Sequence, residues 1–231
     1  MVTTFENATE VVTQEIVDKW KQTRRPEVTS AIMNMVTSKL YDLVPGVITD
    51  LLYRSSNPFV GLIPSDNVLD FARSQWSMVY FFDLMTETVG IPPTWDEYWE
   101  AMNTQYSSFW INRISSTIHT SDQVNRAIKW KMAKAWSAWI RELYVLTSIR
   151  EMGYNIQKHT FADIEGRIDM WYKGSSGIRA VCLTVANKYD INKKEPVVPF
   201  KKFYLPNNNF GTLEWFPDKK QIEEIEIWIN E

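Results

Sequence analysis

The stretch GRIDMWYKGSSGIRAVCLTVANK, residues 166–188, predicts two β-strands joined by a glycine–serine turn. On the first strand, Asp169 is an acid set among apolar residues. On the second strand, alternation places Cys182, Thr184 and Ala186 on one face, and none of these side chains is an acid or a lysine. The stretch therefore indicates a β-hairpin with one carboxylate, whose role depends on the segments around it.

Upstream of this hairpin the apolar residues recur with the period of a helix. We expect Thr94 to cap one helix, with Glu97 completing a capping box, and Ser121 to cap the longest helix, which Gly153 ends. A bend is expected at Pro45. The periodicity predicts helices over residues 7–23, 27–54, 65–90, 95–118 and 122–152.

After Gly153 the period of the apolar residues changes from 3.6 to 2. Short strands are predicted over residues 154–161, 167–173, 178–185, 201–206 and 212–216, and a last helix over 219–231. The expected fold is therefore α+β or α/β, with a helical domain over residues 1–120 followed by an α/β domain over residues 121–231.

Several classes of protein are excluded by what the chain lacks. The 231 residues carry a net charge of −3, which gives no global case for nucleic-acid binding. No phosphate-cradling or dinucleotide-binding glycine motif and no nucleophile elbow occur. The two histidines, His119 and His159, have no metal-ligand spacing, and one cysteine cannot build a zinc site.

The expected location is cytoplasmic. The single cysteine, Cys182, rules out an internal disulfide and fits a reducing compartment. The first residues lack the pattern of a signal peptide, and no apolar run approaches the ~18 residues that span a bilayer. We therefore expect no membrane partner.

A second carboxylate lies on the longest predicted helix. Glu142 follows Trp139 by three residues and precedes Leu146 by four, so it lies on or beside the apolar face. An acid there is costly unless it is paired or binds a cation. By contrast, Asp163 and Glu165 are interpreted as solvated loop acids.

The order of these elements resembles the core of the PD-(D/E)XK nuclease superfamily, which includes restriction endonucleases and Holliday-junction resolvases. That family has a helix with a glutamate, a Gly-Tyr step, a strand with an apolar–Asp–apolar step and a strand that ends in an acid and a lysine. The positions that match are Glu142, Gly153-Tyr154, Ile156 and Ile168-Asp169-Met170.

The resemblance implies a restriction-endonuclease-like core, a mixed sheet flanked by helices, and a metal-dependent DNA endonuclease. It implies Mg²⁺ or Mn²⁺ as cofactor, Asp169 as the central ligand and Glu142 as an additional or water-mediated one. Magnesium is a hard ion that prefers such oxygen ligands. Members of the family often form dimers, so a homodimer is one assembly that the resemblance suggests.

The chain departs from the family at its last motif, where Thr184 replaces the acid and Ala186 the lysine. Three accounts are open. The protein is a relic that binds without cutting; or the lysine has moved, to Lys188, Lys193 or Lys194; or Ala186 was installed to stop cleavage. Under the first and third accounts, cleavage by this sequence is impaired.

A local excess of positive charge marks the longest predicted helix. Between residues 122 and 158 there are seven cationic and three anionic side chains. The predicted nucleic-acid contacts are Lys129, Lys131, Lys134 and Arg141, which interleave with a tryptophan. DNA is therefore the expected partner.

A function of a different class also fits the sequence. The tryptophan-rich helices and the near-neutral charge suggest a non-catalytic interaction factor, phage-encoded or defence-related, whose helical part docks on another protein. The two hypotheses are a nucleic-acid-binding protein of nuclease fold and this protein-interaction factor.

Overall fold

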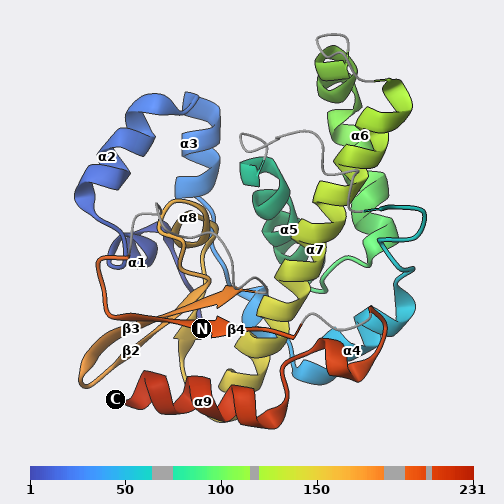
Figure 1. Cartoon of the computed structure of the whole chain (residues 1–231). Helices are drawn as coiled ribbons and strands as arrows, with labels where there is room; N and C mark the ends of the chain where they lie inside the picture. Colours follow the sequence, from blue (N-terminus) through green and yellow to red (C-terminus); the bar gives the residue numbers. More distant parts are fainter. Residues whose placement is uncertain (64–74, 115–119, 185–195, 207–209) are drawn as a thin grey trace.

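The computed structural model shows a mixed α and β fold (Figure 1), and it describes residues 1–63, 75–114, 120–184, 196–206 and 210–231. The N-terminal part is helical. Its elements are α1 (Phe5–Thr9), α2 (Gln14–Thr23), α3 (Pro26–Met33), the 3-10 helix η1 (Lys39–Asp42), α4 (Pro45–Arg54), α5 (Gln75–Val89) and α6 (Trp95–Ile114). The remaining elements are α7 (Ser121–Glu151), β1 (Ile156–Gln157), α8 (Thr160–Ile164), β2 (Met170–Gly174), β3 (Gly177–Thr184), β4 (Phe200–Tyr204), the 3-10 helix η4 (Leu213–Trp215) and α9 (Lys219–Asn230).

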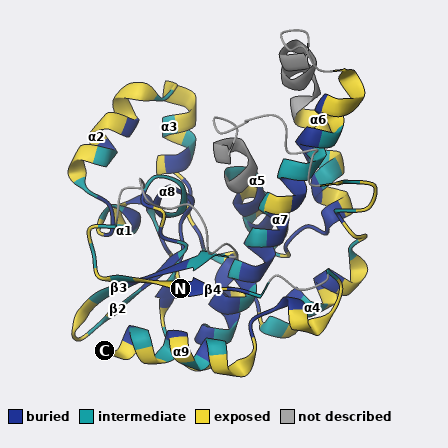
Figure 2. Cartoon of the chain, in the orientation of Figure 1, coloured by how far each residue is buried: buried dark blue, intermediate teal, exposed yellow. Residues whose placement is uncertain are grey.

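Helix α7 runs through the middle of the molecule and is buried along most of its length (Figures 1 and 2). It begins one residue earlier than the sequence predicts, because Thr120 is the N-cap: its side chain accepts from the backbone N–H of Gln123, whose own side chain bonds back to Thr120. It ends before Gly153, whose φ of 98° lies in the left-handed region that glycine adopts without strain.

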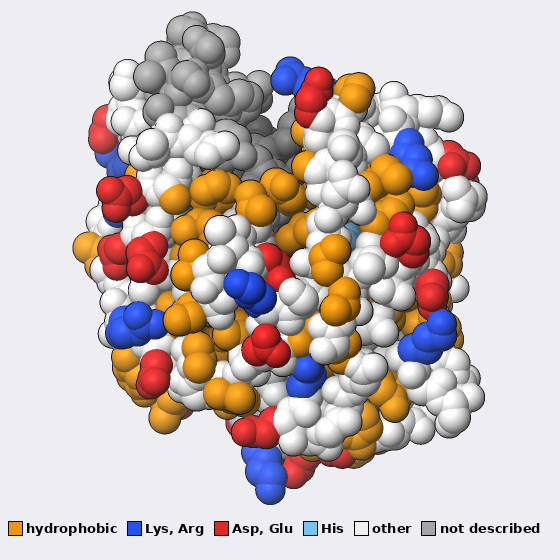
Figure 3. Space-filling view, turned by 180° about the vertical axis from the view of Figure 1, so that it is seen from behind, with side chains coloured by type: hydrophobic (Ala, Val, Ile, Leu, Met, Phe, Trp, Pro, Cys, Tyr) orange, Lys and Arg blue, Asp and Glu red, His pale blue; other side chains and the backbone are white. Residues whose placement is uncertain are grey.

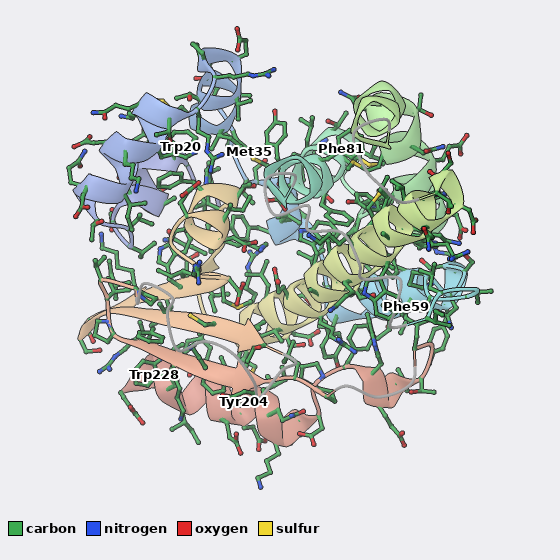
Figure 4. All side chains as sticks on the ribbon, turned by 45° about the horizontal axis from the view of Figure 1, so that its top comes forward. Trp20, Met35, Phe59, Phe81, Tyr204 and Trp228 are labelled. Atoms are coloured by element: carbon green, nitrogen blue, oxygen red, sulfur yellow. The ribbon has the colours of Figure 1, made fainter. Side chains whose placement is uncertain are left out.

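The four described strands form one sheet in the order β1-β2-β3-β4. The first two pairings are antiparallel, and β3 pairs with β4 in parallel. The predicted hairpin is confirmed: β2 and β3 close on a turn in which Gly174 pairs with Gly177, and Gly177 has a φ of 118°. Helix α9 packs along one side of this sheet (Figure 1), and Trp228 donates from it to the Ala180 carbonyl at 3.0 Å (Figure 4).

Two hydrophobic clusters cover the two faces of the sheet. Met170 and Val181 belong to a main cluster built largely on α4, α6, α7 and α9. Their neighbours Trp171 and Ala180 belong to an N-terminal cluster, formed with α1, α2, α3 and α8. Both clusters contain residues from either side of residue 120, so the helical part and the α/β part share their cores rather than packing as separate units.

Four predicted elements differ in the structure. The single helix expected over residues 7–23 is divided into α1 and α2, because Thr13 is the N-cap of a new helix. The single bent helix expected over residues 27–54 is divided, because Pro45 takes the first turn of α4 instead of bending a longer helix. The strand expected over residues 212–216 is the 3-10 turn η4. The strand expected over residues 154–161 ends at Gln157, because His159 caps α8 by accepting from the backbone N–H of Phe161 at 3.1 Å.

The surface carries charges of both signs. Figure 3, a view from behind, shows Lys and Arg interspersed with Asp, Glu and hydrophobic side chains rather than gathered into one basic face. None of the helices in the described ranges is long and apolar enough to cross a membrane.

Candidate metal centre

Three carboxylates from different parts of the chain converge at one place. Glu142, Asp163 and Asp169 each offer one oxygen, and these three oxygens lie within 4.8 Å of one another. Glu142 comes from the middle of α7, Asp163 from the short helix α8, and Asp169 directly precedes β2. The fold thus brings together the two acids that the sequence singled out and adds a third.

A lysine that the sequence did not place lies against these acids. Lys158 is fully buried, and its Nζ contacts Glu142 Oε2 at 2.8 Å and Asp163 Oδ2 at 3.1 Å. Its backbone N–H donates to the hydroxyl of Tyr41 at 3.0 Å. Since both its backbone and its ammonium are engaged, Lys158 is held in a defined position beside two of the three carboxylates.

Each of the three carboxylates uses one oxygen for the protein and keeps one free. Lys158 contacts Oε2 of Glu142 and Oδ2 of Asp163, and the backbone N–H of Leu183 donates to Oδ2 of Asp169. Within the described part of the chain, the other oxygen of each accepts no protein hydrogen bond. The side chains of Glu142 and Asp163 are 12% and 17% exposed, so the cluster reaches solvent.

A fourth acid, Asp83 on α5, contacts the two helices that carry Glu142 and Asp163. It is fully buried, and it accepts from Trp139 Nε1 at 2.9 Å and from the hydroxyl of Thr160. Trp139 lies one turn before Glu142 on α7, and Thr160 begins α8. Asp83 therefore ties together the two helices that carry Glu142 and Asp163.

Burial works against ionisation of Glu142 and Asp169. Desolvation raises the pKa of Glu142 to about 7, against the opposing effect of Lys158. Desolvation, reinforced by the charge of Glu142, also holds the pKa of Asp169 well above its ordinary value. Burial alone would lower the pKa of Lys158, but the surrounding carboxylates outweigh it and raise that pKa well above the ordinary value. The lysine is therefore charged, and Glu142 and Asp169 hold their protons to higher pH than exposed acids do.

Of the residues predicted for the last family motif, the structure describes only Thr184, which is not among these groups. Thr184 ends β3, where it pairs with Tyr204 and its carbonyl accepts from Leu205 at 2.7 Å. Ala186 and Lys188 lie outside the described residues, as do the other proposed lysines, Lys193 and Lys194. The cation that the structure places at the acids is Lys158.

The interpretation of Asp163 and Glu165 as solvated loop acids was wrong. Asp163 lies in α8 and joins the cluster, because the chain forms a short helix where the end of a strand and a loop were expected. Glu165 is partly buried and pairs with Arg24 of the N-terminal part at 3.0 Å.

The four residues predicted to contact nucleic acid separate into two groups. Lys134 is exposed, with its Nζ 6.0 Å from the centroid of the Trp130 ring, and Lys129 and Lys131 are half-buried. The prediction was wrong for Arg141. Its guanidinium is buried over the Trp215 ring at 4.0 Å, and its Nε donates to the Trp215 carbonyl at 3.1 Å. Burial lowers the pKa of Arg141 to about 10, and the side chain serves to attach α7 to η4.

Sequence reasoning missed Lys158 and Asp83. A signal for Lys158 was present: in a strand it would share a face with Ile156, and a lysine on a buried face requires acidic partners. No local pattern pointed to Asp83, which lies on a separate helix far from the motif in sequence.

No family model, curated protein or solved structure matches the chain in the comparisons made with each.

Proposed function

We propose that the protein is a divalent-cation-dependent phosphodiester hydrolase that acts on DNA, with Glu142, Asp163 and Asp169 as the ligands of the cation. Carboxylate oxygens are the ligands that Mg²⁺ and Mn²⁺ prefer. When ionised, the three converging acids would carry more negative charge than Lys158 offsets, and a divalent cation bound there would offset the difference.

The observation that carries this proposal is the pattern of hydrogen bonds to the oxygens of the three carboxylates. Donors from the described residues reach one oxygen each of Glu142, Asp163 and Asp169, and no donor from those residues contacts the other oxygen. Metal ligands in proteins are held by hydrogen bonds of this kind from groups behind them. When bound, a divalent cation polarises a phosphoryl oxygen and lowers the pKa of a coordinated water.

Lys158 would supply the positive charge that the lysine of the family motif supplies and that is missing at Ala186. In nucleases of the family that the sequence resembles, a lysine beside the acids offsets negative charge as the phosphate is attacked. Lys158 carries such a charge against Glu142 and Asp163. A lysine at another place in the chain was expected at Lys188, Lys193 or Lys194, and we propose Lys158 in that role instead, so that the sequence cleaves without restoring a lysine at Ala186.

The remaining cations of α7 favour nucleic acid as the substrate. Lys131 precedes Glu142 by about three turns, which places both on the same side of the helix about 16 Å apart. Lys134 is exposed one turn further along. A DNA strand lying along α7 would meet these lysines with its phosphates while another phosphate faces the acids.

Cleavage of linear and branched duplex DNA at low salt, with Mg²⁺ or Mn²⁺, tests the proposal. We expect cleavage by the wild type and a loss of at least about 10²-fold in rate in Asp169→Asn and in Glu142→Gln, since each removes a charge placed for the transition state. Glu10→Gln is the matched control, because Glu10 is an exposed acid that also pairs with a lysine.

Two outcomes would contradict the proposal. Wild-type protein that binds DNA but cuts nothing with either metal is a binding protein only. Equal cleavage by the wild type and Asp169→Asn places the chemistry elsewhere.

The interaction-factor hypothesis loses its main motivation, because most tryptophans in the described part of the chain are buried.

A further inference from the structure

Four residues of α7 form a ridge that leads from an aromatic contact to the acid cluster. Trp130, Lys134, Ala138 and Glu142 recur every four residues, and side chains at this spacing lie in one row that winds slowly about a helix. None of the four is buried, whereas about half of the residues of α7 are. The axial distance from Trp130 to Glu142 is about 18 Å, and between them Ala138 presents only a methyl group.

The far end of this ridge carries an aromatic ring in a fixed orientation. The Phe59 ring, from the segment that follows α4 (Figure 4), meets the Trp130 ring edge to face, with centroids 5.8 Å apart. Phe59 packs against the main cluster, which fixes its own position. The Nζ of Lys134 lies 6.0 Å from the centroid of the Trp130 ring. An indole with a cation beside it suits an unpaired base, which stacks on the ring while a phosphate meets the charge.

The charge along the ridge suits one strand of nucleic acid. No acidic residue occurs in α7 between Asp122 and Glu142, and Lys131 and Lys134 lie on or beside the ridge. This basic character is local, because the whole chain has a net charge of −3. A single strand carries about one phosphate per 3.4 Å at stacked spacing, half the charge density of a duplex. A narrow row with few lysines therefore matches one strand better than two.

A duplex would also leave the aromatic end of the ridge unused. Paired bases stack on each other inside the double helix, so their faces are not open to a side chain such as Trp130. An unpaired strand can present a base to the indole and its backbone to Lys134 at the same time.

We propose that the substrate is an unpaired strand of DNA, free or as the arm of a fork, which stacks a base on Trp130 and follows the ridge past Lys134 to the acid cluster. This inference rests on the proposed function, because it takes the acid cluster to be the place of cleavage. It adds the class of DNA and a binding residue that lies about 18 Å from Glu142 along α7.

Fluorescence anisotropy with three labelled DNAs of one sequence tests the proposal: a single strand, a forked duplex and a blunt duplex. The measurement is made at low salt with Ca²⁺, which takes oxygen ligands as Mg²⁺ does. We expect the wild type to bind the single strand and the fork at least about tenfold more tightly than the blunt duplex. Tight binding of the single strand with a fork bound only as weakly as the duplex would restrict the substrate to free strands.

Variants of Trp130 show whether stacking causes this preference. Trp130→Leu keeps an apolar contact for Phe59 and removes the ring, so single-strand affinity should fall about tenfold while duplex affinity stays unchanged. Trp130→Phe keeps a ring and should retain most of the affinity. Trp228→Leu is the matched control and should bind as the wild type does, since Trp228 is also half-buried, with Arg179 over its ring at 4.8 Å, but lies on α9.

The results separate this inference from the proposed function. A blunt duplex bound as tightly as the single strand, or a folded Trp130→Leu with unchanged single-strand affinity, would overturn the inference and leave the metal centre in place. A preference for the single strand without cleavage of any of the three DNAs in Mg²⁺ or Mn²⁺ would overturn the proposed function. If circular dichroism shows that Trp130→Leu does not fold, the preference of the wild type among the three DNAs decides alone.

Discussion

Two lysine–glutamate pairs in this protein have almost the same length and differ in nearly everything else. Lys158 contacts Glu142 at 2.8 Å with exposures of 0% and 12%, whereas Lys173 contacts Glu10 at 2.7 Å with exposures of 57% and 37%. The first pair shares its charges with Asp163 and lies in the candidate metal centre, and the second joins β2 to the end of α1 at the surface. The distance between two charges therefore says little about what the pair does, and its burial and further partners say more.

The largest expected effect comes from breaking the buried pair. Lys158→Ala removes the one described cation that contacts Glu142 and Asp163 and leaves their charges without it, which typically costs about 3–5 kcal/mol. Urea unfolding of the metal-free protein should show this loss of free energy of unfolding. A loss below about 1 kcal/mol would put the buried pair in the same class as the surface pair.

The hydrogen bond from the Lys158 backbone to Tyr41 should also contribute to stability. Tyr41→Phe keeps the ring, over which the Arg150 guanidinium lies at 4.3 Å, and removes the hydroxyl that accepts from Lys158. Leaving that buried N–H without a partner costs about 1–3 kcal/mol. We expect urea unfolding to show this loss and Mn²⁺ affinity to fall with it. An unchanged affinity in a destabilised variant would mean that Tyr41 supports the fold alone.

The buried region should respond to acid through His159, which adjoins Lys158. Burial lowers the pKa of His159 to about 4 from its ordinary 6.5, so the unfolded chain binds the proton more readily between these values. Stability therefore falls as the pH falls through this window. Relative to His159→Asn, which keeps a residue that caps helices well, the wild type should lose about 2 kcal/mol between pH 7 and pH 5.

The comparison with His159→Asn also cancels the effect of Glu142, whose protonation changes stability with pH in the opposite direction. Glu142 has a raised pKa, so its protonation on acidification favours the folded state, and this contribution is common to both proteins. Parallel stability curves for the two proteins would show that His159 is not held neutral.

The smallest effect is expected at the surface pair. Lys173→Ala removes an exposed contact to Glu10 and should cost about 0.2–1 kcal/mol in urea unfolding at low salt. In 1 M salt the difference should shrink, because the screening length falls to ~3 Å, close to the 2.7 Å that separates the two charges. A salt-independent loss would indicate that the stem of Lys173 contributes by packing instead.

Sequence reasoning reached part of this site because two of its acids stand out locally. Glu142 is an acid beside the apolar face of a long helix, and Asp169 is an acid among apolar residues at the start of a strand. The predicted helix and hairpin that carry them are present in the structure. Both residues could be singled out because helical and strand periodicity are properties of neighbouring residues.

The rest of the site depends on packing between distant segments. Asp163 was misjudged because a loop was expected around it, where His159 instead starts a short helix. Asp83 reaches the cluster only because α5 packs against both α7 and α8, and periodicity does not tell which helices pack together. Lys158 looked like one more surface cation until the acids around it were placed.

The N-terminal cluster has a consequence for how the chain folds as it leaves the ribosome. Trp20 and Ile32 pack against Phe161 and Trp171, and among the buried members of the cluster none lies between Ile32 and Phe161 in sequence. At about 5–20 residues per second, the first helices wait on the order of ten seconds before their partners are synthesised. During that time their apolar faces are open to chaperones and to other nascent chains, so the yield of folded protein should depend on the speed of translation as well as on the final stability.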